Sequence, residues 1–300
     1  MAELITSAQN PKIKQLLALQ EKSRLRRETG LFVVEGEREL QHCLEAGFEV
    51  DSIFLCDLGG HSNSLQGSPL DKTMAARGHV NGRGPAVRLG GMERSGSFSS
   101  GLALQKIEKA KIFEVSKEVY GKIAYRESTE GIIAEVKVKE RRLEDLKLKE
   151  NPLVIVLESV EKPGNLGAVL RSADAAGADA VIVCDPLTDL FNPNLIRASI
   201  GAIFTVPTVA CTSQEAIAWL KGRGISILTA QLQDSSYYYD TDMRRGVAIV
   251  MGTESTGLTD VWRKAADAHI KIPMNGALDS LNVSVSAAIL LFEAVRQRNA

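Results

Sequence analysis

The sequence of 300 residues lacks the features that mark secreted, membrane and zinc-binding proteins. Its 4 cysteines are scattered, without a C-x-x-C pair or a histidine at metal-site spacing. No apolar run approaches the roughly 20 residues that cross a bilayer, and the first residues do not resemble a signal peptide. We therefore predict a cytoplasmic protein with buried, reduced thiols, no bound metal and no membrane association.

The chain carries no excess of either charge. Its formal net charge of −1 argues against a protein whose overall charge drives it onto nucleic acid, so any affinity for RNA must come from local patches. The sequence also lacks G-x-x-x-x-G-K-[ST] and G-x-G-x-x-G, the phosphate-binding motifs of common nucleotide enzymes. With 44% hydrophobic residues, the chain is long enough for about two domains with sizeable cores.

A local basic patch is predicted near the N-terminus. Asn10 followed by Pro11 is a typical helix start, and apolar residues follow at helical spacing. The polar positions of this helix and of the next turn carry many cations and few acidic residues. We predict contacts with RNA for Lys12, Lys14, Arg24, Arg26 and Arg27. The alternative is an ordinary solvated helix face, which is the usual role of such a charge run.

Strand and helix patterns alternate through the first part of the chain, which predicts a small α/β domain over residues 1–140. Buried strands are expected at 31–34, 52–55, 112–115 and 132–138, with helices at 37–46 and 117–124. Residues 59–101 are rich in glycine, serine and asparagine and lack apolar periodicity, so we predict a flexible insertion there. The charged segment 139–150 then suits a linker.

The second predicted domain, residues 151–300, contains short apolar runs separated by helical stretches. The runs are 153–157, 180–183, 225–229 and 247–251. Runs of this kind are typical of strands buried on both faces of a parallel sheet. This domain is therefore predicted to be α/β, and its ligands are expected at the carboxyl ends of the strands.

A first polar motif follows the strand at 153–157. Asn165 and Arg171 lie in a predicted helix whose apolar face is formed by Leu166, Val169, Leu170 and Ala173. Gly167 precedes Arg171 by one helical turn and leaves space beside the guanidinium, where a substrate anion fits. The alternative makes Asn165 a helix cap and Arg171 a solvated surface residue.

A second motif, Gly252 to Leu258, follows the strand at 247–251. Its glycines and small residues place backbone amides within reach of a ligand, although no lysine ends it as in a Walker loop. Within this motif, Glu254 either stands at a helix start, where the dipole favours a carboxylate, or pairs with Arg171.

A third motif precedes the last predicted helix. It comprises Ile272-Pro273-Met274 and then Ser280-Leu281-Asn282-Val283-Ser284. A polar loop that runs into a helix supplies backbone donors and is interpreted as a ligand loop, with an ordinary capped core helix as the alternative. The helix itself is predicted to be amphipathic, with an apolar face formed by Val285, Ala288, Ile289, Phe292 and Val295.

Together these motifs resemble those of the SpoU (TrmH) family of RNA 2′-O-ribose methyltransferases, in the SPOUT superfamily. The resemblance rests on Asn165-x-Gly167-x-x-x-Arg171, Gly252-x-Glu254-x-x-Gly257-Leu258 and Ser280-Leu281-Asn282. It implies an α/β fold with a C-terminal parallel-sheet SPOUT methyltransferase domain, tied in a trefoil knot, and a smaller N-terminal α/β RNA substrate-binding domain. It also implies S-adenosylmethionine as cofactor and a homodimer.

The resemblance also implies a role for each motif residue. The cofactor pocket would be lined by Thr229, Met251, Gly252, Ile272, Met274 and Leu281. The ribose and its phosphate would face Asn165, Arg171, Glu254, Ser280 and Asn282. A guanidinium with a pKa above about 12 is a poor proton acceptor, so we expect Arg171 to act electrostatically rather than as a general base.

The function predicted from these observations is methyl transfer to a ribose of RNA, with 23S ribosomal RNA ranked ahead of transfer RNA. Two alternatives belong to other classes. One is a catalytically silent RNA-binding protein of ribosome assembly, although Asn165, Arg171 and Asn282 are all present. The other is a nucleotide-phosphate enzyme built on the turn from Gly252 to Gly257, which lacks the lysine such a turn needs.

Overall fold

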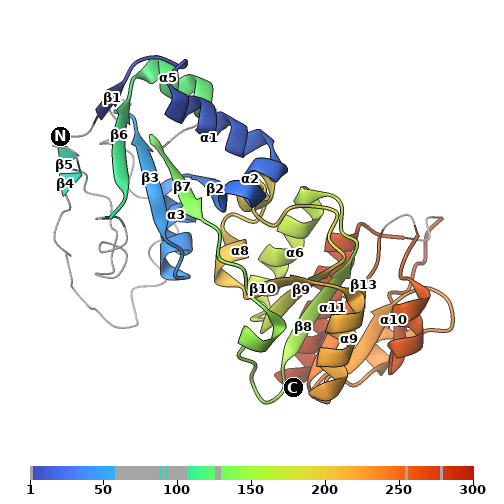
Figure 1. Ribbon diagram of the computed structural model, residues 1–300. Coiled ribbons are helices and arrows are strands. Elements are labelled where there is room, and N and C mark those ends of the chain that lie inside the picture. Colours follow the sequence, from blue (N-terminus) through green and yellow to red (C-terminus); the bar gives the residue numbers. More distant parts are fainter. Residues whose placement is uncertain are drawn as a thin grey trace, which may run out of the picture.

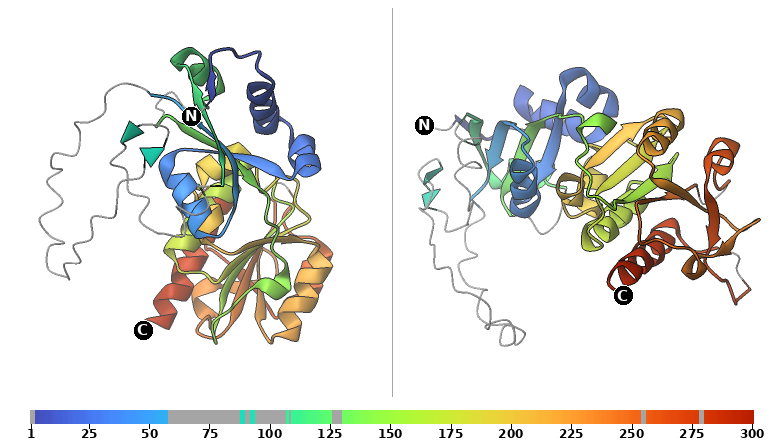
Figure 2. Two further views of the ribbon diagram at one scale, coloured as in Figure 1. Left: turned by 60° about the vertical axis from the view of Figure 1, so that its left-hand side comes forward. Right: turned by 90° about the horizontal axis from the view of Figure 1, so that it is seen from below.

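Two β-sheets lie in opposite halves of the molecule in Figure 1, which is a computed structural model. The structure describes residues 3–57, 88–89, 92–93, 107, 109–125, 130–253, 256–277 and 280–300. A five-stranded sheet belongs to the N-terminal part and a seven-stranded sheet to the C-terminal part. Figure 2 shows from two further sides that the blue-to-green sheet and the yellow-to-red sheet remain separate.

The N-terminal sheet has the order β1-β6-β3-β7-β2, with β7 antiparallel to both of its neighbours. Its strands are β1 (Glu3–Ile5), β2 (Leu31–Glu35), β3 (Val50–Leu55), β6 (Lys111–Val115) and β7 (Ile132–Lys137). The helices are α1 (Pro11–Glu21), α2 (Ser23–Thr29), α3 (Glu37–Glu45) and α5 (Lys117–Ile123). Asn10 caps α1 as predicted, because its side chain accepts a hydrogen bond from the backbone N–H of Lys12.

The predicted insertion at 59–101 lies outside the described residues except for a short hairpin. In this hairpin, β4 (Arg88–Leu89) pairs antiparallel with β5 (Met92–Glu93). The predicted flexibility of the remaining insertion therefore stays a prediction.

The C-terminal sheet is parallel throughout and has the order β10-β9-β8-β13-β11-β14-β12. Its strands are β8 (Leu153–Glu158), β9 (Ala180–Cys184), β10 (Thr208–Cys211), β11 (Ser226–Ala230), β12 (Ser236–Tyr237), β13 (Val247–Met251) and β14 (Ala268–Lys271). The strands β8, β9 and β13 are buried along their whole length, as the continuous apolar runs predict. The sequence pattern did not predict β10, β12 and β14, because all three are short, β10 and β14 are only partly buried, and β12 is exposed.

Helices cover both faces of this sheet (Figure 1). One face carries α6 (Pro163–Ala175) and α11 (Val283–Arg298), which pack against each other. The other face carries α9 (Ser213–Gly222) and α10 (Asp260–Ala265), and the short helices α7 (Pro193–Ala198) and α8 (Ala202–Thr205) pack against α6. The fold is therefore a three-layer α/β arrangement, with a hydrophobic core on each side of the sheet.

The two halves share one hydrophobic core through a cluster of phenylalanines. Phe32 of β2 packs against Phe191 with ring centroids 4.6 Å apart, and Phe48 packs against Phe204 of α8 at 5.3 Å. All four rings belong to the same group of packed apolar residues or contact one another directly. The N-terminal and C-terminal parts are thus held in a defined arrangement by aromatic packing.

The charged segment 139–150 is more than the predicted linker. It contains a short 3-10 turn, Leu143–Asp145, and the side chains of Leu143 and Leu146 are buried in the core beside α9 and α10. The prediction missed this anchoring because two leucines among so many charged residues show no clear periodicity.

The C-terminal helix differs from its prediction. In α11 the buried side chains are Ala287, Leu290, Leu291, Glu293 and Ala294. Of the face predicted to be apolar, Val285 and Phe292 each keep 47% of their surface accessible, whereas Val295 packs against the core. A second apolar face carries most of the buried side chains, and the sequence pattern did not single it out.

The cysteines are free thiols, and those at positions 43, 56 and 184 are buried. Among the residues described, no helix has the length and the apolar character needed to span a bilayer.

Candidate active site

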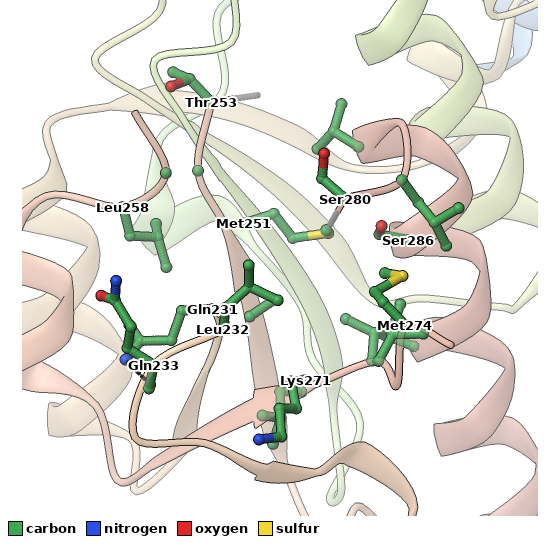
Figure 3. Close-up of a pocket in the computed structure, with 18 of the residues that line it drawn as sticks. Gln231, Leu232, Gln233, Met251, Thr253, Leu258, Lys271, Met274, Ser280 and Ser286 are labelled. Atoms are coloured by element: carbon green, nitrogen blue, oxygen red, sulfur yellow. Dashed lines mark hydrogen bonds between the residues drawn. The ribbon is translucent and has the colours of Figure 1, made fainter. Parts of the chain in front are cut away.

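A cavity of about 700 Å³ lies at the carboxyl ends of β11, β13 and β14. This is the edge of a parallel sheet at which ligands bind in α/β proteins. Figure 3 shows Met251, Met274 and Ser280 around the same space, the first from the end of β13 and the other two from the connection between β14 and α11. The size and the mixture of apolar side chains with polar loops are those of a small-molecule site.

The turn after β13 forms one wall, and it closes because residue 252 has no side chain. The backbone N–H of Thr253 donates to the carbonyl of Gly257 at 3.2 Å, and the N–H of Gly257 donates to the carbonyl of Thr253 at 3.1 Å. A Cβ atom on Gly252 would stand 2.2 Å from the carbonyl carbon of Gly257. Glycine therefore allows the chain to fold back on itself at the cavity wall.

Most of the residues predicted to hold the cofactor line this cavity. They are Met251, Gly252, Ile272, Met274 and Leu281. Thr229 does not line it, because its side chain is fully buried and its Oγ1 lies 2.6 Å from Nδ1 of His269. The following residue, Ala230, contributes to the wall instead.

Arg263 of α10 adds a polar group to this wall. Its Nε is buried and has no hydrogen-bond partner among the residues described. An unpartnered buried donor is costly, so the cavity suits a ligand that supplies an acceptor. S-adenosylmethionine combines an adenine with a carboxylate, and it therefore fits both the apolar walls and the free donor.

A second cavity, of about 640 Å³, adjoins the first and shares with it Gly252, Thr253, Thr256 and Val283. Asn165 lines the second cavity and Asn282 lines the first. Between them, Nδ2 of Asn282 donates to Oδ1 of Asn165 at 3.2 Å. The first and third sequence motifs therefore meet where the two cavities join.

Asn282 also begins the last helix. Its Oδ1 accepts hydrogen bonds from the N–H of Ser284 at 2.9 Å and from Oγ of Ser284 at 2.6 Å. The same side chain thus caps α11 and fixes the start of α6 against it. Ser280, two residues earlier, is exposed and lines the first cavity, whereas Glu254 lies outside the described residues.

The helix α6 places its two predicted site residues on different sides. Its N-cap is Lys162, so Asn165 stands inside the first turn and is not the cap. A Cβ atom on Gly167 would lie 2.6 Å from Cβ of Ala198, which shows how closely α6 approaches α7. Arg171 is exposed and lines neither cavity, because it stands most of two turns beyond Asn165 on the helix.

Several residues of the site were not predicted. Thr256 lies within the second motif and Lys271 directly precedes the third, so both were within reach of the sequence pattern. Arg263 was not, since it comes from a helix outside the motifs. Among the described residues, no three His, Cys, Asp or Glu side chains gather as they would around a metal ion.

The basic residues predicted to contact RNA have unequal surroundings. Nζ of Lys12 lies 2.5 Å from Oε2 of Glu3, and Nε of Arg24 lies 2.6 Å from Oε1 of Glu28. Lys14 and Arg27 are exposed, and neither has an ion pair within the described part of the chain. Their placement leaves them available to a polyanion.

Arg26 corrects the prediction. Its side chain is only 3% exposed, and its Nε donates to Oδ2 of Asp189 at 2.6 Å. Its Nη1 donates to the carbonyls of Leu19 and Gln20 at 2.6 and 3.2 Å. Because its donors are used inside the protein, Arg26 joins the two halves of the molecule and does not face RNA.

Comparison with known proteins places this site in a family. Residues 152–292 match the SpoU rRNA Methylase family, and residues 10–80 match the MRM3-like substrate binding domain. The 23S rRNA (guanosine-2′-O-)-methyltransferase RlmB of Vibrio vulnificus (strain CMCP6) is 41% identical over 181 residues, which are 58% of this chain and 73% of the relative.

Solved structures extend the likeness over the whole chain. A crystal structure of an RNA 2′-O ribose methyltransferase has a TM-score of 0.73 at 35% identity, covering 99% of this chain and all of the other. An AdoMet-bound rRNA methyltransferase from Sinorhizobium meliloti has a TM-score of 0.78 at 26% identity, covering 98% of each chain.

The chain belongs to the SpoU family. The predicted family and α/β fold are thereby confirmed, as is the predicted class of enzyme, an S-adenosylmethionine-dependent RNA ribose methyltransferase.

Proposed function

We propose that this protein transfers a methyl group from S-adenosylmethionine to a ribose 2′-hydroxyl of 23S ribosomal RNA. The observation that carries the proposal is the meeting of Asn165 and Asn282 at the junction of two cavities, one of which suits the cofactor. The choice of 23S rRNA over transfer RNA rests on relatives such as the Vibrio vulnificus RlmB enzyme, whose substrate is 23S rRNA.

The first cavity would hold the cofactor, which supplies an electrophilic methyl group when bound. Met251, Ile272 and Leu281 would enclose it between apolar surfaces, and the turn at Gly252 would bring backbone close to it. Arg263 would supply a hydrogen-bond donor to an acceptor group of the cofactor. These residues bind and orient, and they exclude water from the reacting centre.

The second cavity would receive the target ribose. Asn165 and Ser280 would orient the sugar with hydrogen bonds, and Asn282 would keep the two motifs in register. Arg171 would hold the phosphate next to that ribose and stabilise the charge that develops on the attacking oxygen. The hydroxyl proton then passes to the phosphate or to water, because a guanidinium does not accept it.

A homodimer would bring Arg171 to the site. This residue lines neither cavity of its own chain, and the outward face of α11 exposes Val285 and Phe292. An exposed apolar stripe on a well-packed helix suits contact with another protein surface. We therefore place Arg171 in the active site of the partner chain. The family's trefoil knot, and the division into domains 1–140 and 151–300, belong to the same proposal.

Methyl transfer to defined RNAs tests the function. Labelled S-adenosylmethionine would be incubated with unmodified 23S rRNA and with transfer RNA transcripts, and the products hydrolysed with alkali. A methylated 2′-hydroxyl cannot assist cleavage, so label in alkali-resistant dinucleotides of 23S rRNA is the expected result. Label only in mononucleotides would mean base methylation and refute the proposal. Label only in transfer RNA would make transfer RNA the substrate in place of 23S rRNA. Cofactor binding without any methyl transfer would favour the catalytically silent RNA-binding protein.

Mixing two inactive variants tests the place of Arg171. Arg171→Ala is expected to lower turnover about 100-fold or more, with cofactor affinity nearly unchanged. If the arginine acts across the dimer, mixed dimers of Arg171→Ala and Asn282→Ala regain one intact site, and activity returns to a fraction of the wild-type value. Activity that stays at the level of the separate variants, in a mixture shown to exchange subunits, would place Arg171 in its own chain's site.

A further inference from the structure

A third cavity, of about 800 Å³, lies between the two halves of the molecule. Its walls come from α2, from the segment that follows β7, and from the loop between β9 and α7. Phe191 of the aromatic cluster forms part of the wall, and the pair of Arg26 and Asp189 forms another part. The cavity is therefore bounded by packed and bonded groups and exists before any ligand arrives.

Three cations line this cavity without a partner. Arg27 and Lys139 are exposed and Arg141 is partly buried, and within the described residues none of them forms an ion pair. Burial lowers the pKa of Arg141, which reflects the cost of holding its charge away from water with no carboxylate beside it. The carboxylates of Glu21 and Glu140 also lie in the wall, and Asp189 is already used by Arg26.

The cavity lies next to the proposed active site. Leu187, in the loop after β9, lines both this cavity and the second cavity that contains Asn165. Leu187 stands on the ridge between the two cavities and is 67% exposed. The second cavity in turn shares Gly252 and Thr256 with the cofactor cavity. From the proposed cofactor site to the interdomain cavity, each cavity thus shares lining residues with the next.

We propose that the interdomain cavity binds a backbone phosphate of the RNA strand that flanks the target nucleotide. Arg27, Lys139 and Arg141 supply the donors, and Leu187 contacts the sugar or base that crosses the ridge between the cavities. The inference rests on the proposed function, because the ligand is the flanking part of the same RNA. It gives the course of the substrate strand, which would run from the catalytic residues toward the junction of the two domains.

The chemistry favours a phosphodiester over other ligands. Three cations that line one cavity without forming ion pairs suit a polyanion, and phosphate accepts paired hydrogen bonds from arginine. The position of this cavity beside the proposed active site favours an anion attached to the substrate over a separate small molecule. The exposed apolar side chain of Leu187 suits packing against a nucleoside, which a free inorganic phosphate does not need.

Substitution of Arg141 tests the proposal, with its neighbour as a matched control. Arg141→Gln and Arg142→Gln remove the same charge, but Arg142 is exposed and already paired with Asp145, with Nε 3.4 Å from its carboxylate. Binding of a 23S rRNA fragment would be measured for each variant at several salt concentrations. We expect Arg141→Gln to weaken binding about tenfold and to reduce the slope of log K against log salt by about 0.7. Arg142→Gln should leave both unchanged.

A second variant guards against a folding defect at Arg141. Lys139 is exposed, so Lys139→Gln should leave the free energy of unfolding unchanged while it weakens RNA binding and lowers the salt slope. If wild-type protein methylates 23S rRNA and both variants bind RNA like wild type, the interdomain phosphate site is refuted and the proposed function stands. If wild-type protein neither binds nor methylates ribosomal RNA, the proposed function itself fails.

Discussion

The two halves of the molecule place their polar residues in different ways. In the C-terminal half, Asn165, Gly252 and Asn282 are far apart in the chain, yet they meet at one edge of the sheet. In the N-terminal half, the predicted RNA contacts come from one short stretch, yet they have different surroundings. Lys12 pairs with Glu3, and Arg26 is buried against Asp189.

The difference teaches which sequence patterns carry positional information. Motifs at the ends of parallel strands converge because the strands end at a common edge, so their grouping follows from the fold. Charges on a helix and the turn after it point in many directions, and their partners depend on tertiary contacts that the local pattern does not encode. Four experiments sharpen this contrast, from the largest expected effect to the smallest.

Arg26→Ala tests whether a residue predicted to bind RNA is structural instead. Its removal leaves Asp189 without its partner and the carbonyls of Leu19 and Gln20 without their donor. We expect the free energy of unfolding, measured by urea denaturation, to fall by roughly 3–5 kcal/mol. The exposed neighbour provides the control, since Arg27→Ala should change the free energy of unfolding by less than about 0.5 kcal/mol. Equal effects of the two substitutions would contradict a buried, structural role for Arg26.

Gly252→Ala tests whether backbone fit builds the proposed cofactor cavity. The added Cβ meets backbone atoms of Gly257, so the turn must open at a cost of about 3 kcal/mol. Affinity for S-adenosylmethionine, measured by calorimetry, should fall about 100-fold. In the control Gly164→Ala, at the start of α6, the new methyl group meets nothing within 4 Å. A variant at position 252 with unchanged affinity would show that the turn is not part of the site.

Glu135→Gln tests a buried carboxyl in the N-terminal sheet. Burial raises the pKa of Glu135 to about 7 from its ordinary value of 4.5, although its Oε2 accepts a hydrogen bond from Oγ of Ser52 at 2.8 Å. Between pH 4.5 and about 7, the folded state therefore keeps a proton on Glu135 that the unfolded state has released. The free energy of unfolding should fall by about 3 kcal/mol as the pH rises from about 4.5 to about 7.

The variant should remove most of this pH dependence. Denaturation curves at several pH values would measure it, and Glu118→Gln serves as the control. Glu118 is exposed, and its hydrogen bond with Lys122 lowers its pKa, so its shift is opposite in direction to that of Glu135. A wild-type protein whose stability is constant from pH 4.5 to 7 would contradict the assignment.

Lys14→Gln, compared with Arg24→Gln, tests the remaining basic patch. Lys14 has no ion pair among the described residues, whereas Arg24 is paired with Glu28. Loss of the free cation should weaken binding of a ribosomal RNA fragment roughly two- to fivefold, and loss of the paired one should have less effect. Filter binding at low salt would resolve the difference. The reverse order would mean that RNA displaces Glu28 from Arg24.

The sequence predicted the elements whose burial is complete. The strands β8, β9 and β13 are continuous apolar runs buried on both faces, and the pattern located each of them. It missed β12, whose residues are exposed, and β14, which is only partly buried. It identified only one of the two apolar faces of α11, and periodicity cannot decide which of the two is covered by the chain itself.

The site was predicted to the extent that it consists of motifs. Five of the six predicted cofactor residues line the cavity, because they follow the ends of β13 and β14 or precede α11. The exception, Thr229, is one residue too early in its strand, where the side chain turns into the core. Arg171 stands outside the cavities of one chain, and no linear pattern tells whether a residue serves its own chain or another.

The shared phenylalanine core limits how the RNA preference of this protein can be redesigned. A chimaera that exchanges residues 1–140 alone would set a foreign surface against Phe191 and Phe204, which pack against Phe32 and Phe48 in this protein. Residues 1–140 therefore cannot be exchanged by themselves without disturbing this packing. A new RNA target requires that the loop after β9 and the helix α8 be exchanged together with the N-terminal half. The packed interface between the two halves is then transferred as a unit.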